Sequence, residues 1–379
     1  MIKSFYNCAI YTNTTMLNNA LCLCTSSNSH QLDHLAVLSY VLDIPLLLTD
    51  PLLYKQGKHF YPFTNLLYLS DKDCSLEFLA KNYEVLFVSC KHWGRELAIS
   101  MKELFNKSLR FFYCPHGNSD KGHLNPETDL LHHQDLSLIY GSHMKDMLTH
   151  RGVLQTLQGT ATTGNYRYHY YMKHKPFYDS LIQKEVFSKF KKNQTTILYA
   201  PTWKDPENST SFFEVSELLL KQLPDHYNLI VKLHPNLEHD HPAHVYSLIG
   251  KYENKPNVIF LSQYPLVYPI LNQVDIYLGD FSSVGYDFLA FNKPMLFFNT
   301  PQRHLEADKG LFLFRCGEII PKEIYHDLYS LISIHLKSAQ AYLLDLRQEI
   351  YQYAFEKNTN PIALQEDIIH LLKTTKPLY

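Results

Sequence analysis

Short apolar runs alternate with longer helix-like stretches along this chain, and this alternation limits the possible folds more than any other feature. The runs of the first half span 44–49, 83–90, 109–115 and 136–142, and those of the second half span 195–201, 228–234, 257–262, 274–280 and 294–299. Such alternation is typical of parallel sheets that are covered by helices on both faces. We therefore predict an α/β fold.

The apolar runs fall into two groups, which a helix-like segment without a strand signal separates at 166–194. A chain of 379 residues is long enough for two domains. We predict one domain over 1–165 and a second over 195–379, with 166–194 as the linker between them. The second domain is expected to end in helices, because apolar residues recur at helical spacing from about Pro321 onward.

The charge balance and the cysteines exclude several classes of protein. With 35 basic and 37 acidic residues the chain has no global field that would capture nucleic acid, so we expect no nucleic-acid partner. The 7 cysteines contain no CxxC pair, which argues against a zinc finger or a disulfide framework and favours a reducing, cytoplasmic location. Residues 1–24 lack the continuous apolar core of a signal peptide, and no later run reaches the length of a membrane span.

Polar residues follow several apolar runs, at the points where strands of a parallel sheet would end. Ligands of open parallel sheets bind outside the carboxyl ends of the strands, so these residues are candidates for a binding site. In the second half they are Thr202, Lys204, Lys232, His234, Asp280, Ser282 and Ser283. We expect them to emerge at one edge of the sheet.

Ser282 and Ser283 precede an apolar segment that is expected to be helical to about Asn292, so they occupy N-cap and first-turn positions. Free backbone N–H groups and two hydroxyls at a helix start suit a phosphate or pyrophosphate. One alternative is that the serines only cap the helix. A serine hydrolase is another alternative, but its nucleophile elbow needs glycine at the position of Phe281.

His116 and Gly117 follow the run 109–115 in the first half, and Lys121 lies in the polar turn behind them. His116 is placed to act as a base, and Gly117 allows a ligand to approach the backbone closely. The alternative is a structural histidine held by hydrogen bonds. Because His116 and His234 come from different halves, we expect both to face a cleft between the domains. The histidine-rich run 234–244 is interpreted as a solvated loop, because its spacing fixes no tetrahedral metal site.

The motifs taken together resemble the CDP-glycerol glycerophosphotransferase family of teichoic-acid primases and polymerases. The matching stretches are PHG with a following lysine (115–121), TGNYRY (163–168), LYAPTWK (198–204), VKLHP (231–235), VDIYLGDFSSVGYDFLAFNKPMLFF (274–298) and, more loosely, HLEADKGLFLF (304–314). The resemblance covers about residues 110 to 315. It implies a GT-B fold, in which two Rossmann-like domains face each other across a cleft.

The resemblance also implies a reaction. A glycerol-phosphate or related polyol-phosphate group would pass from a CDP-activated donor to a hydroxyl of a cell-envelope glycopolymer or glycolipid, and the acceptor would be lipid-linked. His116 would be the base, and His234 with Lys232, Ser282 and Ser283 would hold the pyrophosphate. The other residues that map onto the family's motifs are Gly117 and Lys121 on the acceptor side and Thr202, Lys204 and Asp280 on the donor side. The scheme needs neither a metal ion nor a cofactor.

The chain departs from the family's motifs in ways that leave the transferred group open. Asn118 and Ser119 stand where the family commonly has Thr-Pro, Lys204 stands where it usually has arginine, and Phe281 replaces tyrosine. A GT-B glycosyltransferase that uses a CMP- or UDP-sugar is therefore the alternative enzyme. A catalytically silent nucleotide-binding or scaffold protein is the alternative outside enzymes.

The linker segment suggests a membrane contact, because aromatic residues interleave with Arg167, Lys173 and Lys175 between 166 and 178. A lipid-linked acceptor would place the protein at the inner face of the cell membrane as a peripheral protein. The alternative is a linker whose tyrosines pack against both domains.

Overall fold

The computed structural model describes residues 17–25, 29–91, 93–123, 126–306, 308–337, 341–356 and 360–379. The prediction that the chain begins without a signal peptide rests mostly on residues 1–16, which lie outside the described residues. No helix in the described part of the chain is both long enough and apolar enough to cross a membrane.

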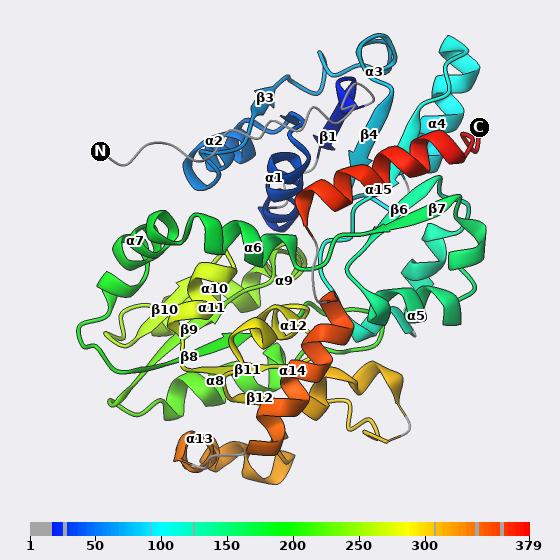
Figure 1. Cartoon of the computed structure of the whole chain (residues 1–379). Helices are drawn as coiled ribbons and strands as arrows, with labels where there is room; N and C mark the ends of the chain where they lie inside the picture. Colours follow the sequence, from blue (N-terminus) through cyan, green and yellow to red (C-terminus); the bar gives the residue numbers. More distant parts are fainter. Residues whose placement is uncertain are drawn as a thin grey trace, which may run out of the picture.

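The first domain is built on a parallel sheet of 7 strands in the order β3-β2-β1-β4-β5-β6-β7 (Figure 1). The strands are β1 (Ala20–Cys24), β2 (Leu46–Leu48), β3 (Leu66–Tyr68), β4 (Val85–Val88), β5 (Arg110–Tyr113), β6 (Leu136–Ile139) and β7 (Gly159–Thr162). The helices of this domain include α1 (Ser29–Leu42), α2 (Pro51–Phe60), α3 (Leu76–Asn82), α4 (Trp93–Phe105) and α5 (Ser142–His150). The central strands are buried along their whole length, which explains their continuous apolar runs.

The second domain repeats this design with a parallel sheet of 6 strands in the order β10-β9-β8-β11-β12-β13. The strands are β8 (Thr195–Ala200), β9 (Tyr227–Lys232), β10 (Val258–Leu261), β11 (Ile276–Gly279), β12 (Met295–Phe297) and β13 (Glu318–Ile319). The helices include α8 (Phe212–Gln222), α9 (Pro235–Asp240), α10 (Pro242–Tyr252), α11 (Tyr268–Gln273), α12 (Val284–Phe288) and α13 (Leu328–Lys337). Both sheets reverse their strand order beside their first strand, as in Rossmann folds.

The predicted α/β fold with two Rossmann-like domains is therefore confirmed, and every predicted apolar run forms a strand. The sequence did not predict β1, β3, β7 and β13. The predicted helical segment after Ser283 is present as α12 and a following 3-10 turn, which ends at Asn292 in a left-handed conformation.

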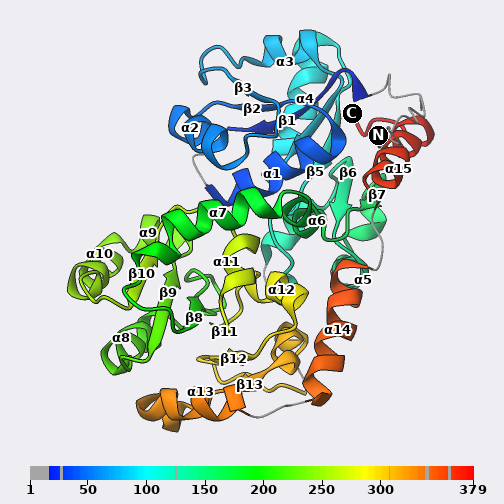
Figure 2. The same ribbon diagram turned by 60° about the vertical axis from the view of Figure 1, so that its left-hand side comes forward.

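Four helices lie outside the two sheet cores, in the linker and near the C-terminus. They are α6 (Tyr166–Lys173) and α7 (Lys175–Glu185) in the linker segment, and α14 (Ala341–Phe355) and α15 (Pro361–Thr374) near the C-terminus. Three of them, α6, α7 and α14, run along the junction of the two domains (Figure 2). The structure differs from the expected grouping at α15, which packs on the first domain by burying Leu364, Ile368 and Leu372. Gln365 of this helix donates a hydrogen bond to the carbonyl oxygen of Val41 at 3.0 Å.

A buried arginine joins the domains. Arg167 on α6 donates from Nη1 to the Asp33 carboxylate of α1 at 2.6 Å, and it also pairs with Asp287 of α12. Tyr268 of α11 donates to Asp287 at 2.7 Å. A second contact forms at Asp120, which accepts from the backbone N–H of Leu313 at 2.9 Å. These contacts hold the carboxyl ends of the two sheets against one cavity.

Candidate active site

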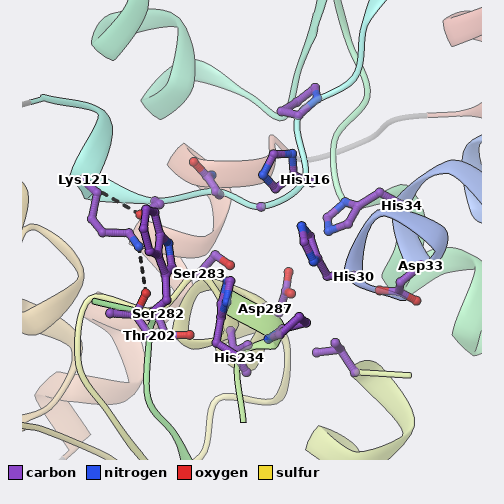
Figure 3. Close-up of a pocket in the computed structure, with 18 of the residues that line it drawn as sticks. His30, Asp33, His34, His116, Lys121, Thr202, His234, Ser282, Ser283 and Asp287 are labelled. Atoms are coloured by element: carbon purple, nitrogen blue, oxygen red, sulfur yellow. Dashed lines mark hydrogen bonds between the residues drawn. The ribbon is translucent and has the colours of Figure 1, made fainter. Parts of the chain in front are cut away.

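A cavity between the two domains is lined by residues that follow strands β1, β5, β8, β9 and β11 (Figure 3). Two pairs of neighbouring strands, β1 with β4 and β8 with β11, mark the points where the strand order of each sheet reverses. Loops diverge at such points and leave room for a ligand outside the carboxyl ends of the strands. The topology therefore explains why this cavity forms here.

Most of the site residues predicted from the sequence meet in this cavity. Those that line it are His116, Gly117, Lys121, Thr202, Lys232, His234, Ser282 and Ser283. Lys204 lies outside the lining, with its Nζ 5.7 Å from the ring centroid of Phe213. Asp280 lies outside it as well and is fully buried.

The Asp280 carboxylate holds two loops of the second domain together. It accepts hydrogen bonds from the backbone N–H of Thr202 at 2.9 Å and of Ser211 at 2.7 Å, and from the Ser211 hydroxyl at 2.8 Å. Burial raises the pKa of Asp280 to about 6, although these donors oppose the shift. Asp280, which is buried outside the cavity lining, thus holds Thr202 in position at the cavity wall.

Lys232 ends β9, and His234 follows it at the wall of the cavity. His234 is the N-cap of α9, and its Nδ1 accepts a hydrogen bond from the backbone N–H of Asn236 at 3.1 Å. The neutral ring therefore carries its proton on Nε2 and can donate one hydrogen bond to an anion. Burial lowers the pKa of His234 and also lowers the pKa of Lys232 to about 8. The Lys232 Nζ donates to the carbonyl oxygen of Tyr264 at 2.9 Å.

A chain of hydrogen bonds fixes the loop that carries His116. Tyr140 donates its hydroxyl proton to the Pro115 carbonyl oxygen at 2.7 Å and accepts from the Gly117 N–H at 3.1 Å. His34 Nδ1 lies 2.8 Å from the Tyr140 hydroxyl, and its Nε2 lies 3.1 Å from Arg167 Nη1. Because a guanidinium only donates, Nε2 is the acceptor and Nδ1 carries the proton. Arg167 thus orients the loop through His34 and Tyr140.

His116 is half-buried at the tip of this loop. Burial and, to a smaller extent, the neighbouring Lys91 and Lys121 lower its pKa to about 4. A histidine with this pKa is neutral at physiological pH, which is the state that a general base requires.

Lys121 reaches from the first domain to the second. Its Nζ donates to the Thr202 hydroxyl at 2.7 Å, lies 3.4 Å from the Asp205 carboxylate and lies 5.7 Å from the centroid of the Trp203 ring. The lysine therefore closes one side of the cavity across the domain boundary.

His30 also lines the cavity, although it is not among the residues predicted from the sequence. Its ring centroid lies 5.2 Å from that of His116 and 5.7 Å from that of His234. Burial lowers the pKa of His30 to about 3, with contributions from His116 and Lys232. The available signal was the run ALCLC at 20–24, because a strand there would have made His30 a residue that follows a strand end.

The charges around the cavity favour an anion. The carboxylates of Asp33 and Asp287 pair with Arg167, and Glu127 pairs with Lys91 at 3.2 Å. The neutral imidazoles and the lysine ammonium groups remain as donors to a ligand. No group of three or more His, Cys, Asp or Glu side chains among the described residues is arranged to hold a metal ion.

Two Rossmann-like domains that meet at such a cavity define a GT-B fold. The family model for CDP-glycerol:poly(glycerophosphate) glycerophosphotransferase matches residues 138–358. The chain belongs to this family, as its motifs suggested.

The chain is similar to two enzymes of teichoic acid synthesis. The teichoic acid glycerol-phosphate primase of Bacillus subtilis (strain 168) is 33% identical over 138 residues, which cover 36% of this chain and 34% of that protein. The teichoic acid poly(glycerol phosphate) polymerase of Staphylococcus epidermidis is 31% identical over 168 residues, which cover 42% of this chain and 21% of that protein. The matches thus span about a third or less of these relatives.

Solved structures share the fold. The wall teichoic acid polymerase TagF superposes with a TM-score of 0.58 at 16% identity, covering 94% of this chain and 88% of that chain. HepE of Anabaena in complex with UDP-glucose gives a TM-score of 0.55 at 12% identity, covering 94% and 99%. At these identities the likeness shows the fold alone.

Gly117 provides the first test of this site. Its φ is 138°, and a Cβ atom there would lie 2.6 Å from the Ser283 Oγ of the other domain. We expect Gly117→Ala to separate the loop from Ser283 and to reduce turnover by about tenfold or more, since small displacements at a reacting centre are costly. Gly250→Ala is the matched control, because a Cβ at Gly250 meets nothing within 4 Å. Equal activity of both variants would contradict the close contact.

Proposed function

We propose that this protein transfers a glycerol-phosphate or related polyol-phosphate group from a CDP-activated donor to an acceptor hydroxyl of a cell-envelope glycopolymer or glycolipid. The observation that carries the proposal is the convergence of His116, His234 and the Ser282–Ser283 turn on one cavity between the two domains. The family match and the primase and polymerase relatives support the same reaction. A TagF structure soaked with CDPG supports the same class of donor.

In the proposed reaction the acceptor oxygen attacks the β-phosphorus of the donor. The hydroxyl proton passes to the neutral His116, an O–P bond forms, and the bond from the β-phosphorus to the bridging oxygen breaks. CMP leaves with that oxygen and the electron pair. His116 is the candidate base for two reasons. It belongs to the first domain, across the cavity from the residues proposed to bind the donor phosphates, and its lowered pKa keeps it neutral.

The second domain is the candidate donor side. His234 can donate from Nε2, Lys232 supplies positive charge below about pH 8, and the two serine hydroxyls add uncharged donors. Thr202 would lie near the same phosphates, with Lys121 and Gly117 on the acceptor side. Lys204 is left out of this proposal because it lies outside the cavity lining, and Asp280 is given a supporting role.

A nucleotide-release assay tests the donor. The protein is incubated with CDP-glycerol, CDP-ribitol, a CMP-sugar and UDP-sugars, together with a cell-envelope extract as acceptor. We expect release of CMP from a CDP-polyol. Release of UDP alone would overturn the proposal in favour of a glycosyltransferase. This activity is the alternative because HepE, which shares the fold, was solved in complex with UDP-glucose. Nucleotide binding without any release would favour the catalytically silent alternative.

The two histidines should differ in what they contribute. We expect His234→Ala to weaken binding of CDP as well as turnover, because it removes a donor to phosphate. His116→Ala should leave CDP affinity unchanged and lower the rate by roughly two to four orders of magnitude, the usual contribution of a general base. Calorimetric titration with CDP, followed by transfer assays at saturating donor, separates the two effects. Equal losses of CDP affinity would refute these roles.

We further propose that the acceptor is lipid-linked and that the protein works at the cytoplasmic face of the membrane. Four tyrosines of the linker do not make the contact that the sequence suggested, because Tyr166, Tyr170, Tyr171 and Tyr178 are buried. Phe63 and Phe177 are exposed, and their rings lie 5.3 Å apart. Phe177 follows Lys173 and Lys175 closely in the linker, so the two rings and these lysines form a smaller candidate for the membrane contact.

Sedimentation with anionic phospholipid vesicles tests the membrane contact. We expect binding at low salt, and a loss of roughly tenfold in partitioning when both Phe63→Ser and Phe177→Ser are introduced. The matched control is Leu104→Ser with Phe105→Ser on α4, where the exposed apolar side chains lie on another surface. If the unchanged protein stays in the supernatant at low salt, the membrane contact is ruled out.

A further inference from the structure

His30 lies between the two histidines to which the proposed reaction assigns roles (Figure 3). It belongs to the first turn of α1, in the first domain, and its ring faces His116 of the same domain and His234 of the other. His116 stands where the acceptor loses its proton, and His234 stands where the donor phosphates are held. The group that passes between these two positions is the β-phosphoryl group of the donor.

The surroundings of His30 are suited to an anion. Its Nδ1 is buried and has no hydrogen-bond partner among the described residues, so it is open to a partner from a ligand or a water molecule. Asp33, one turn further along α1, already pairs with Arg167, and no ion pair joins His30 to a carboxylate in the described part of the chain. Lys232 adds positive charge nearby.

We propose that His30 binds the phosphoryl group that is transferred, by donating a hydrogen bond to a non-bridging oxygen of the donor's β-phosphate. This inference rests on the proposed CDP-activated donor. His30 neither gains nor loses a proton in the step, because the acceptor proton goes to His116 and CMP leaves with the bridging oxygen. His30 would hold the reacting phosphorus between the base His116 and the residues that bind the leaving CMP. It would also stabilise the negative charge on the oxygens of the transferred phosphoryl group.

The test compares ligands that carry or lack a second phosphate. Calorimetric titrations with CDP, CMP and inorganic pyrophosphate are made on the unchanged protein and on His30→Ala. We expect His30→Ala to weaken CDP and pyrophosphate by about 10- to 100-fold, the size expected for one hydrogen bond to a charged group. CMP affinity should stay within about twofold, because CMP has no β-phosphate. Loss of equal size for CMP and CDP, or no loss for either, would overturn the inference.

Two further variants guard against a purely structural effect. His30→Gln keeps an N–H donor without a titrating group, and we expect it to recover a large part of the CDP affinity. Gln31→Ala is the matched control on the same turn of α1, because Gln31 does not line the cavity. If His30→Gln binds CDP as weakly as a well-folded His30→Ala, the hydrogen bond is not the cause and the inference fails.

The pyrophosphate titration separates this inference from the proposed function. A protein that binds pyrophosphate through His30 but binds no cytidine nucleotide would refute the CDP donor and still support the phosphate contact of His30. A protein that binds CDP with an affinity independent of His30 would support the CDP donor and refute the phosphate contact of His30. Failure of the unchanged protein to bind pyrophosphate would overturn the contact itself.

Discussion

The arrangement of the active site depends on the buried ion pairs of Arg167. Its guanidinium contacts a carboxylate from each domain, Asp33 on α1 and Asp287 on α12, and all three side chains are almost completely shielded from water. Burying such charges is costly, and removal of one partner from a buried pair typically destabilises a protein by about 3–5 kcal/mol. The pairing therefore favours the geometry in which the two domains meet, because separation would leave desolvated charges without partners.

The same guanidinium also reaches the loop that carries His116. It donates to His34, which holds Tyr140, which in turn fixes the backbone on both sides of His116. Contact between the domains and orientation of the candidate base are thus parts of one hydrogen-bonded network.

The sequence predicted most of the strands that are buried on both faces, because such strands are apolar along most of their length, but it missed the buried strand β1. It missed β3 and β13, which lie at sheet edges, and β7, whose residues Gly159 to Thr162 are small or polar. Missing β1 had the largest consequence, since His30 follows that strand. The motifs located His116 and His234, but position after a strand does not reveal which way a side chain points. Asp280 and Lys204 follow strands as the other site residues do, yet one is buried behind a loop and the other lies outside the cavity.

The linker shows how one composition can fit two environments. Tyrosines mixed with basic residues are typical of a membrane interface, where a ring is buried and its hydroxyl meets water. A helix packed between two domains has the same need, but its hydroxyl groups must find acceptors inside the protein. Tyr166 donates to the carbonyl oxygen of His34 at 3.3 Å, and Tyr178 donates to that of Phe60 at 2.8 Å. Because these acceptors lie far away in the sequence, only the folded chain distinguishes a tyrosine that packs on a neighbouring domain from one that meets lipid.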